Sequence, residues 1–292
     1  MKIFSNIRFS ASFPVILGMM MMMTNLSARA FRIHCKEDTV KVSSILSKTA
    51  EHGGTFGERC VFVASQLEGT PWSAPFDNDS IGTIIVNMHG FDRLGFINTV
   101  MALADASMKN MPTIKEFVYS LEAMSRRKGI DEGFVSQLHY GADWIVDNVY
   151  RGHVKEMTEY VGGGSFKAKT LDYVSRHKDE YPALKDSIVL EKIKMIEMGY
   201  RSHRIPHLKK QSAGNKSLHE LMQNGDIIMM LSPEIDYDIY DMGFVEMKNG
   251  EPYLKHISHE SGIVVTDEYP LSRLFKIEGQ HFYGYRWLRP TE

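Results

Sequence analysis

The C-terminal third of the chain constrains the fold most, because it carries short apolar segments separated by turn residues. The segment IIMML (227–231) is a continuous apolar run, and YDIYDMGFVEM (237–247) alternates apolar and polar residues. Both patterns are typical of strands. The pair Asn249-Gly250 then predicts a hairpin turn. Further strands are expected in EPYLKHIS, GIVVTD and FYGYRWLRP, so this end of the chain predicts an antiparallel sheet.

The preceding part of the chain predicts mainly helices. Two are expected within 38–67, broken at HGG, and the segment 111–200 is expected to be mostly helical. Helices followed by an antiparallel meander indicate the α+β class. The more local expectations are a strand at TIIVN, capping boxes at TIKE and SLHE, a helical stripe along FVSQLHYGADWIVDNVY and a helix over SIVLEKIKMIEMGY. The basic segment RSHRIPHLKK is expected to be a solvated loop or, alternatively, to border a groove for an anionic ligand.

The N-terminus predicts export. Lys2 and Arg8 precede an apolar run over 13–23, and Ala28 and Ala30 provide the small residues of a signal peptidase site. The run is too short to span a bilayer. We therefore predict a signal peptide over 1–30, a single domain over 31–292, no membrane span after cleavage, and a location in the periplasm or cell envelope of a bacterium.

Charge and cysteine content restrict the partners and the redox chemistry. Cleavage after Ala30 removes three basic residues and no acidic one, so the net charge changes from −2 to −5. Such a chain lacks the basic field that nucleic-acid binding requires. Cys35 and Cys60 can form a disulfide in an oxidising compartment. Alternatively, Cys60 is a small core residue on a helix, and the sequence leaves these two possibilities open.

One charged residue conflicts with its surroundings. In the segment GFDRLGFINTVMALADAS (90–107), Asp92 can cap a helix whose inward stripe includes Ile97, Val100 and Ala104. The same spacing puts Arg93 on that stripe. A positive charge in the first turn of a helix opposes the helix dipole, and on an inward face it also loses hydration. Arg93 therefore needs a carboxylate partner.

Several segments together carry a family resemblance. They are LEGTPW, VNMHGFDRLGFINTVMALA, LHYGADWIVDN, NGDIIMM, DMGFVEMKNGEPYLKHIS and YGYRWLRP, and the resemblance they carry covers roughly residues 55 to 290. In this order and spacing the chain resembles the N-acetylmuramoyl-L-alanine amidase-like family, within the NlpC-type papain-like cysteine cell-wall hydrolases. The resemblance implies a papain-like α+β fold with an N-terminal helical part, a central antiparallel sheet and a helical insertion.

The resemblance also implies an altered catalytic site. The family has Phe-Asp-Cys at the helix start, where this chain has Phe91-Asp92-Arg93, and His-x-Gly on a strand, where it has Asp241-Met242-Gly243. His256 keeps the third polar position. A guanidinium stays protonated and cannot attack a carbonyl carbon. We therefore expect no catalytic residues in the degenerate site of Arg93, Asp241 and His256, and a structural ion pair between Arg93 and Asp241.

The implied partner is peptidoglycan, a muropeptide or an envelope protein. Trp72, His89, Asp92 and His256 are the residues expected to contact such a ligand. No metal or cofactor is expected, because the spacing of these residues matches no zinc signature. The alternative is an active amidase or peptidase that uses a displaced nucleophile, or a metal held by His89, Asp241 and His256.

Overall fold

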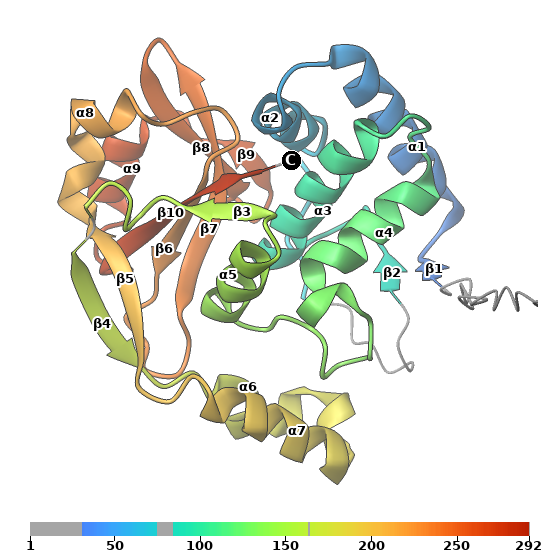
Figure 1. The fold of residues 1–292 in the computed structure, drawn as a ribbon. Helices are drawn as coiled ribbons and strands as arrows, with labels where there is room; N and C mark the ends of the chain where they lie inside the picture. Colours follow the sequence, from blue (N-terminus) through green and yellow to red (C-terminus); the bar gives the residue numbers. More distant parts are fainter. Residues whose placement is uncertain (1–30, 75–83, 163, 292) are drawn as a thin grey trace, which may run out of the picture.

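The computed structural model describes residues 31–74, 84–162 and 164–291, in which a helical part lies beside a large sheet (Figure 1). The predicted signal peptide and part of the loop after Trp72 lie outside the described residues. The helical part contains α1 (Lys36–His52), α2 (Phe56–Gln66), α3 (Arg93–Ser107) and α4 (Ile114–Ser125). The break between α1 and α2 and the start of α3 confirm the predictions. The short strands β1 (Phe31–Ile33) and β2 (Ile84–Val86) pair in parallel beside these helices.

The large sheet is antiparallel, as the sequence predicts. Its described strands follow the order β4-β5-β10-β6-β7-β8-β9, and β3 pairs with one end of β10. Asn249 and Gly250 have positive φ angles of 53° and 79° and join β7 to β8, which is the backbone of the predicted hairpin turn. The bounds are β3 (Val154–Glu156), β4 (Ser165–Lys169), β5 (His203–Lys209), β6 (Ile227–Leu231), β7 (Ile239–Lys248), β8 (Glu251–Ile257), β9 (Val264–Thr266) and β10 (Gly284–Pro290).

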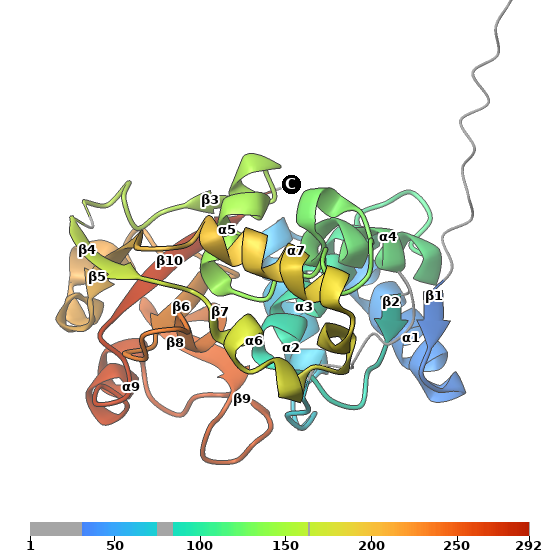
Figure 2. The same cartoon turned by 90° about the horizontal axis from the view of Figure 1, so that it is seen from below.

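Both faces of the sheet are covered, which explains why β6 is a continuous apolar run. Ile227, Met229 and Leu231 pack into the core shared with α1 to α4, whereas Ile228 and Met230 pack into a second core on the opposite face. The second core is closed by α8 (Lys216–His219) and α9 (Leu271–Ile277). The sheet therefore lies between these two sets of helices (Figures 1 and 2).

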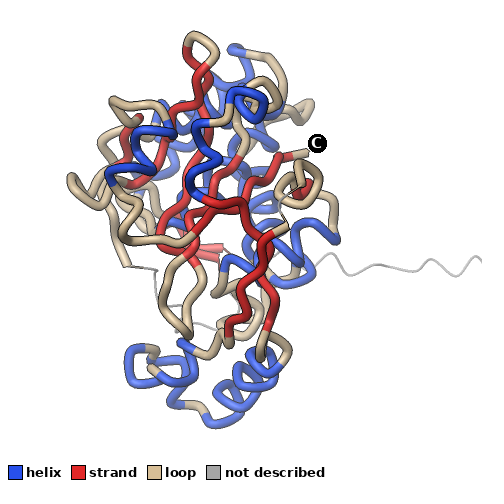
Figure 3. Tube along the Cα trace, turned by 90° about the vertical axis from the view of Figure 1, so that its left-hand side faces the viewer, coloured by secondary structure: helices blue, strands red, loops and turns tan. Residues whose placement is uncertain are grey.

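A third, smaller group of helices projects from one end of the molecule (Figure 3). It includes α6 (Tyr173–Arg176) and α7 (Ser187–Met198), which pack with residues before α5 (Gly141–Tyr150) around a separate core. The helix predicted at SIVLEKIKMIEMGY is confirmed as α7. Four short 3-10 helices complete the described elements: η1 (Arg127–Gly129), η2 (Lys178–Glu180), η3 (Pro182–Lys185) and η4 (Lys210–Gly214).

Three local predictions were wrong. The stripe along FVSQLHYGADWIVDNVY is helical only from Gly141, because the distant Asp238 carboxylate accepts the N–H groups of Gly141 and Ala142 and fixes the helix start there. The segment RSHRIPHLKK is largely the strand β5, which is held by β4 and β10. The SLHE capping box does not form, since Asn215, rather than Ser217, caps α8.

Two further observations concern the membrane and the cysteines. No helix among the described residues is long and apolar enough to cross a membrane. Cys35 and Cys60 are both free thiols in the structure. Cys60 is fully buried on α2, in agreement with its interpretation as a core residue.

Candidate functional site

The candidate site begins at the N-terminus of α3. Asp92 is the N-cap, and its carboxylate accepts the Gly95 N–H at 2.8 Å. Burial raises the pKa of Asp92, although the Gly95 hydrogen bond and the Arg93 charge oppose this shift. Arg93 is the first residue of the helix, and its Nε donates to Asp241 Oδ1 at 3.0 Å. This distance confirms the predicted ion pair between Arg93 and Asp241.

The carboxylate of Asp241 is shared with a histidine on the neighbouring strand. Asp241 lies on β7 and is 2% exposed, and His256 Nδ1 on β8 lies 2.6 Å from Asp241 Oδ2. Gly243 faces His256 across the two strands, and a Cβ on Gly243 would lie 2.8 Å from His256 Cβ. The absence of a side chain at Gly243 therefore leaves the room that His256 occupies. The other ring nitrogen of His256 lies 3.2 Å from Asp267 Oδ1.

This arrangement keeps His256 charged. Burial opposes the charge, but the carboxylates of Asp241 and Asp267 outweigh burial and raise the pKa of His256 to about 10. Burial alone would raise the pKa of Asp241, yet His256 and Arg93 hold it below its ordinary value. At neutral pH the cluster is thus a carboxylate between a guanidinium and an imidazolium. Neither cation can accept a proton, so this cluster holds no general base of the Cys–His type.

His259 covers the outer side of Arg93. One terminal nitrogen of the Arg93 guanidinium lies 3.0 Å and 2.8 Å from the two ring nitrogens of His259. The His259 ring stacks on Tyr240, with centroids 4.3 Å apart. Burial lowers the pKa of His259, and the charge on Arg93 lowers it further, against the opposing effect of Asp241. A neutral ring is therefore favoured between the arginine and the tyrosine.

Trp72 lies on the loop next to the start of α3. Its backbone bridges Phe91, and its N–H donates to the Gly262 carbonyl at 2.7 Å, in the loop that follows His259. The Trp72 side chain remains 49% exposed. The structure thus places an exposed aromatic ring on a loop whose backbone joins the segments carrying Arg93 and His259. Contact of Trp72 with a ligand stays a prediction.

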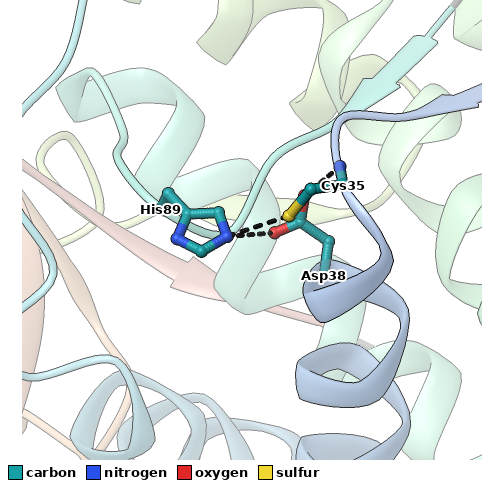
Figure 4. A group of neighbouring side chains, drawn as sticks. All are labelled: Cys35, Asp38 and His89. Atoms are coloured by element: carbon teal, nitrogen blue, oxygen red, sulfur yellow. Dashed lines mark hydrogen bonds and ion pairs between the residues drawn. The ribbon is translucent and has the colours of Figure 1, made fainter.

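His89 belongs to a different cluster. Its Nε2 lies 3.0 Å from Cys35 Sγ and 3.5 Å from Asp38 Oδ1, as Figure 4 shows. The contacts of His256, by contrast, are with Asp241 and Asp267. The alternative metal centre of His89, Asp241 and His256 is therefore not assembled by the described residues, because these side chains take part in separate clusters.

Three residues at these two clusters were not predicted from the sequence. Asp267 is the second carboxylate against His256, and Cys35 and Asp38 surround His89. The only local signal is the spacing of Cys35 and Asp38, which form a capping box at the start of α1. Burial, followed by the neighbouring acidic side chains of Glu37 and Asp38, raises the pKa of the Cys35 thiol, while a backbone hydrogen bond opposes this shift.

Comparisons with solved structures support the fold. A structure described as an N-acetylmuramoyl-L-alanine amidase from Bacteroides uniformis matches with a TM-score of 0.73 and 24% identity, over 82% of this chain and 100% of that chain. A putative xylanase from Bacteroides fragilis matches with a TM-score of 0.69 and 26% identity, over 77% and 98%. Protein LPG0564 from Legionella pneumophila, assigned to the family model DUF1460, matches with a TM-score of 0.66 and 17% identity, over 88% and 95%.

The sequence comparisons are consistent with this likeness. A search of curated proteins found no match. Residues 63–279, which include α3, β7 and β8, match the family model described as AmiA-like, N-acetylmuramoyl-L-alanine amidase-like. The match covers well over half of the chain and includes all of the segments on which the resemblance in the sequence rests except YGYRWLRP, at 283–290. The chain therefore belongs to the AmiA-like, N-acetylmuramoyl-L-alanine amidase-like family.

Proposed function

We propose that this protein is an exported, catalytically inactive relative of the peptidoglycan amidases, with a papain-like fold, and that it binds cell-wall peptides. The observation that carries the proposal is the 3.0 Å ion pair between Arg93 and Asp241. The family resemblance places a cysteine nucleophile and a histidine base at these two positions. An arginine has no route to covalent catalysis, and its partner is occupied in neutralising it.

The state of His256 supports inactivity independently. This histidine is held between Asp241 and Asp267 with its pKa raised to about 10, so it remains an imidazolium at neutral pH. Even a nucleophile brought in from elsewhere would find no proton acceptor on this ring. The whole cluster, and not Arg93 alone, therefore lacks the groups that covalent catalysis requires.

The surroundings of the cluster support a binding role. Trp72 presents an exposed indole on the loop beside the start of α3, and Tyr240 and His259 form a stacked pair over Arg93. Aromatic rings supply a large apolar contact area together with polar edges, which suits a peptide or sugar ligand. Cell-wall peptides are the ligand class that family membership favours. An envelope protein is the other partner that this surface would suit.

Incubation with purified peptidoglycan tests both parts of the proposal. We expect the protein to pellet with the insoluble polymer and to release peptides only at the background rate, with or without added zinc. Trp72→Ala should weaken pelleting by at least about 10-fold, as for an exposed aromatic contact residue. Tyr150→Ala is the matched control, since Tyr150 is 89% exposed on α5 and should leave pelleting unchanged. Peptide release above background would contradict inactivity, and failure to pellet would contradict the proposed ligand.

A displaced nucleophile is the competing function, and Cys35 is its candidate. Cys35 lies at the N-cap of α1, with Sγ 3.0 Å from His89 Nε2. If this pair were catalytic, peptide release would be measurable and would disappear in Cys35→Ser. It would persist in Arg93→Ala. The same assay with these two variants therefore separates an active protein with a moved dyad from an inactive one.

Export is tested separately. Because the segment before Phe31 has the charge, apolar run and small residues of a signal peptide, we expect the exported protein to begin at Phe31. N-terminal sequencing of the protein recovered from the envelope fraction measures this directly. Substituting Ala28 and Ala30 by larger residues should cause the uncleaved precursor to accumulate. A mature protein that still carries Met1 would contradict the prediction.

A further inference from the structure

The cluster of Cys35, Asp38 and His89 is built by the small parallel pair of strands. β1 leads into Cys35 and β2 leads toward His89, and the His34 N–H donates to the Val86 carbonyl at 2.9 Å where the two strands end. Parallel strands end at the same edge, so residues 54 positions apart meet there. Asp38 follows one turn into α1. Asp38 lies on α1, Cys35 is the N-cap of that helix, and His89 lies on the loop that follows β2.

The three donor atoms point at one another. Cys35 Sγ lies 3.0 Å from His89 Nε2 and 3.4 Å from Asp38 Oδ2, and the His89 Nε2 to Asp38 Oδ1 distance is 3.5 Å. Ligands about 2.0–2.3 Å from a tetrahedral zinc ion lie about 3.3–3.7 Å from one another. The 3.4 Å and 3.5 Å separations, each to a different oxygen of Asp38, fall within this range, and the 3.0 Å separation of sulfur and nitrogen is shorter. One ligand atom from each residue lies within 4.8 Å of the other two. A small outward movement of the exposed His89 ring would lengthen the distance from Cys35 Sγ to His89 Nε2 to that of a tetrahedron edge.

The geometry favours a metal over a catalytic triad. In a triad the carboxylate holds the ring nitrogen that lies away from the nucleophile. Here the thiol and the carboxylate both face Nε2 of His89. This arrangement does not orient the ring for proton transfer, but it brings sulfur, nitrogen and oxygen donors to one point. Thiolate, imidazole and carboxylate are the donors that zinc takes in proteins.

We propose that Cys35, Asp38 and His89 bind a divalent ion of the zinc class. The thiol loses its proton to solvent when the metal binds, so one thiolate and one carboxylate balance the charge of the ion. Three protein ligands leave one tetrahedral position for water or another small ligand. The His89 side chain is 56% exposed, which gives the ion access to the cluster. This site is separate from the Arg93 cluster and does not depend on the proposed function.

Asp38 is already held in position for this role. It is fully buried, and its two oxygens accept the N–H groups of Met88 at 2.9 Å and Cys35 at 3.1 Å. Each carboxylate oxygen has a second lone pair that can face the ion. Such outer contacts fix a ligand before the metal arrives and increase affinity. The same hydrogen bonds anchor the loop that carries His89 to the start of α1.

Cobalt titration of the reduced, chelator-treated protein tests the proposal. We expect one Co²⁺ per chain, with a thiolate-to-cobalt charge-transfer band and the visible bands of a tetrahedral site, and we expect Zn²⁺ to displace the cobalt. Cys35→Ser should abolish the charge-transfer band although the buried Cys60 thiol remains. His89→Gln should weaken binding by at least about 10-fold.

His52→Gln is the matched control, because His52 is an exposed histidine at the other end of α1. It should bind cobalt like the unmodified protein. Circular dichroism of each variant establishes that the fold is retained. Absence of cobalt binding by the unmodified protein would overturn the proposal. Binding that is unchanged in Cys35→Ser and His89→Gln would overturn it equally, whatever the outcome of the peptidoglycan experiments.

Discussion

Replacing Asp241 with alanine is expected to lower the free energy of unfolding by about 3–5 kcal/mol, because it leaves the half-buried Arg93 without a carboxylate and the buried His256 with Asp267 alone. Asp241 is 2% exposed and contacts Arg93 at 3.0 Å and His256 at 2.6 Å. Denaturant unfolding followed by circular dichroism measures the change. Glu191→Ala is the control, since Glu191 forms an exposed ion pair with Lys194 and its loss should cost less than about 1 kcal/mol.

The corresponding change at Arg93 is expected to be smaller. Arg93→Ala leaves Asp241 buried, but His256 still neutralises it, and the Arg93 side chain is itself 23% exposed. The double variant Arg93→Ala with Asp241→Ala should be less destabilised than the sum of the single variants, because the arginine is no longer left without a partner. Additive effects would contradict an energetic coupling between Arg93 and Asp241.

The strands were predictable wherever the apolar pattern of the local sequence reflects their burial. β6 is a continuous apolar run because both of its faces are covered, and the turn at Asn249-Gly250 is fixed by residues that tolerate positive φ. The start of α5 was not predictable in this way. Its first N–H groups are capped by Asp238, which lies 97 positions away from Gly141 in the sequence. The helical stripe in the sequence therefore starts several residues before the residue at which the helix itself begins.

Of the two side-chain clusters, one was likewise predictable from the sequence and the other was not. The pairing of Arg93 with Asp241 was predictable because a charge on an inward stripe requires a partner, and the family resemblance indicated which strand supplies it. The contact between Cys35 and His89 depends on the parallel pairing of β1 with β2, two three-residue strands with little pattern of their own. Nothing in the spacing of these residues identifies that pairing.

The protonation of His256 leads to the second large effect, a stability that falls with rising pH. The pKa of His256 is about 10 in the folded protein and is ordinarily 6.5. Between these values the folded state holds a proton that the unfolded state has released, so the free energy of unfolding decreases as pH rises through this range. Below pH 6.5 the contribution is complete. Between pH 6.5 and about 10 the loss of this contribution amounts to a few kcal/mol, on the order of 1.4 kcal/mol per unit of pKa shift.

Asp241 acts at the opposite end of the pH scale. Its pKa lies below the ordinary value of 3.8, because His256 and Arg93 outweigh the effect of burial. Its contribution to stability is therefore present above that ordinary value and is lost as pH falls through the lower, folded-state pKa. The cluster as a whole should stabilise the protein most between about pH 4 and pH 6.5, where Asp241 is ionised and His256 is protonated in both states.

Unfolding free energies of the unmodified protein and of His256→Gln, measured from pH 6.5 to 10, test this account. The stability difference between the two proteins should shrink by about 3 kcal/mol or more across the range, since glutamine cannot carry the charge. Taking the difference also removes other groups that titrate there, including Lys169, whose pKa burial lowers to about 8. His52→Gln, at an exposed histidine, should follow the unmodified protein throughout. A constant difference between the unmodified protein and His256→Gln would mean that His256 does not hold its proton against Asp241 and Asp267, and His256 would then be available as a base.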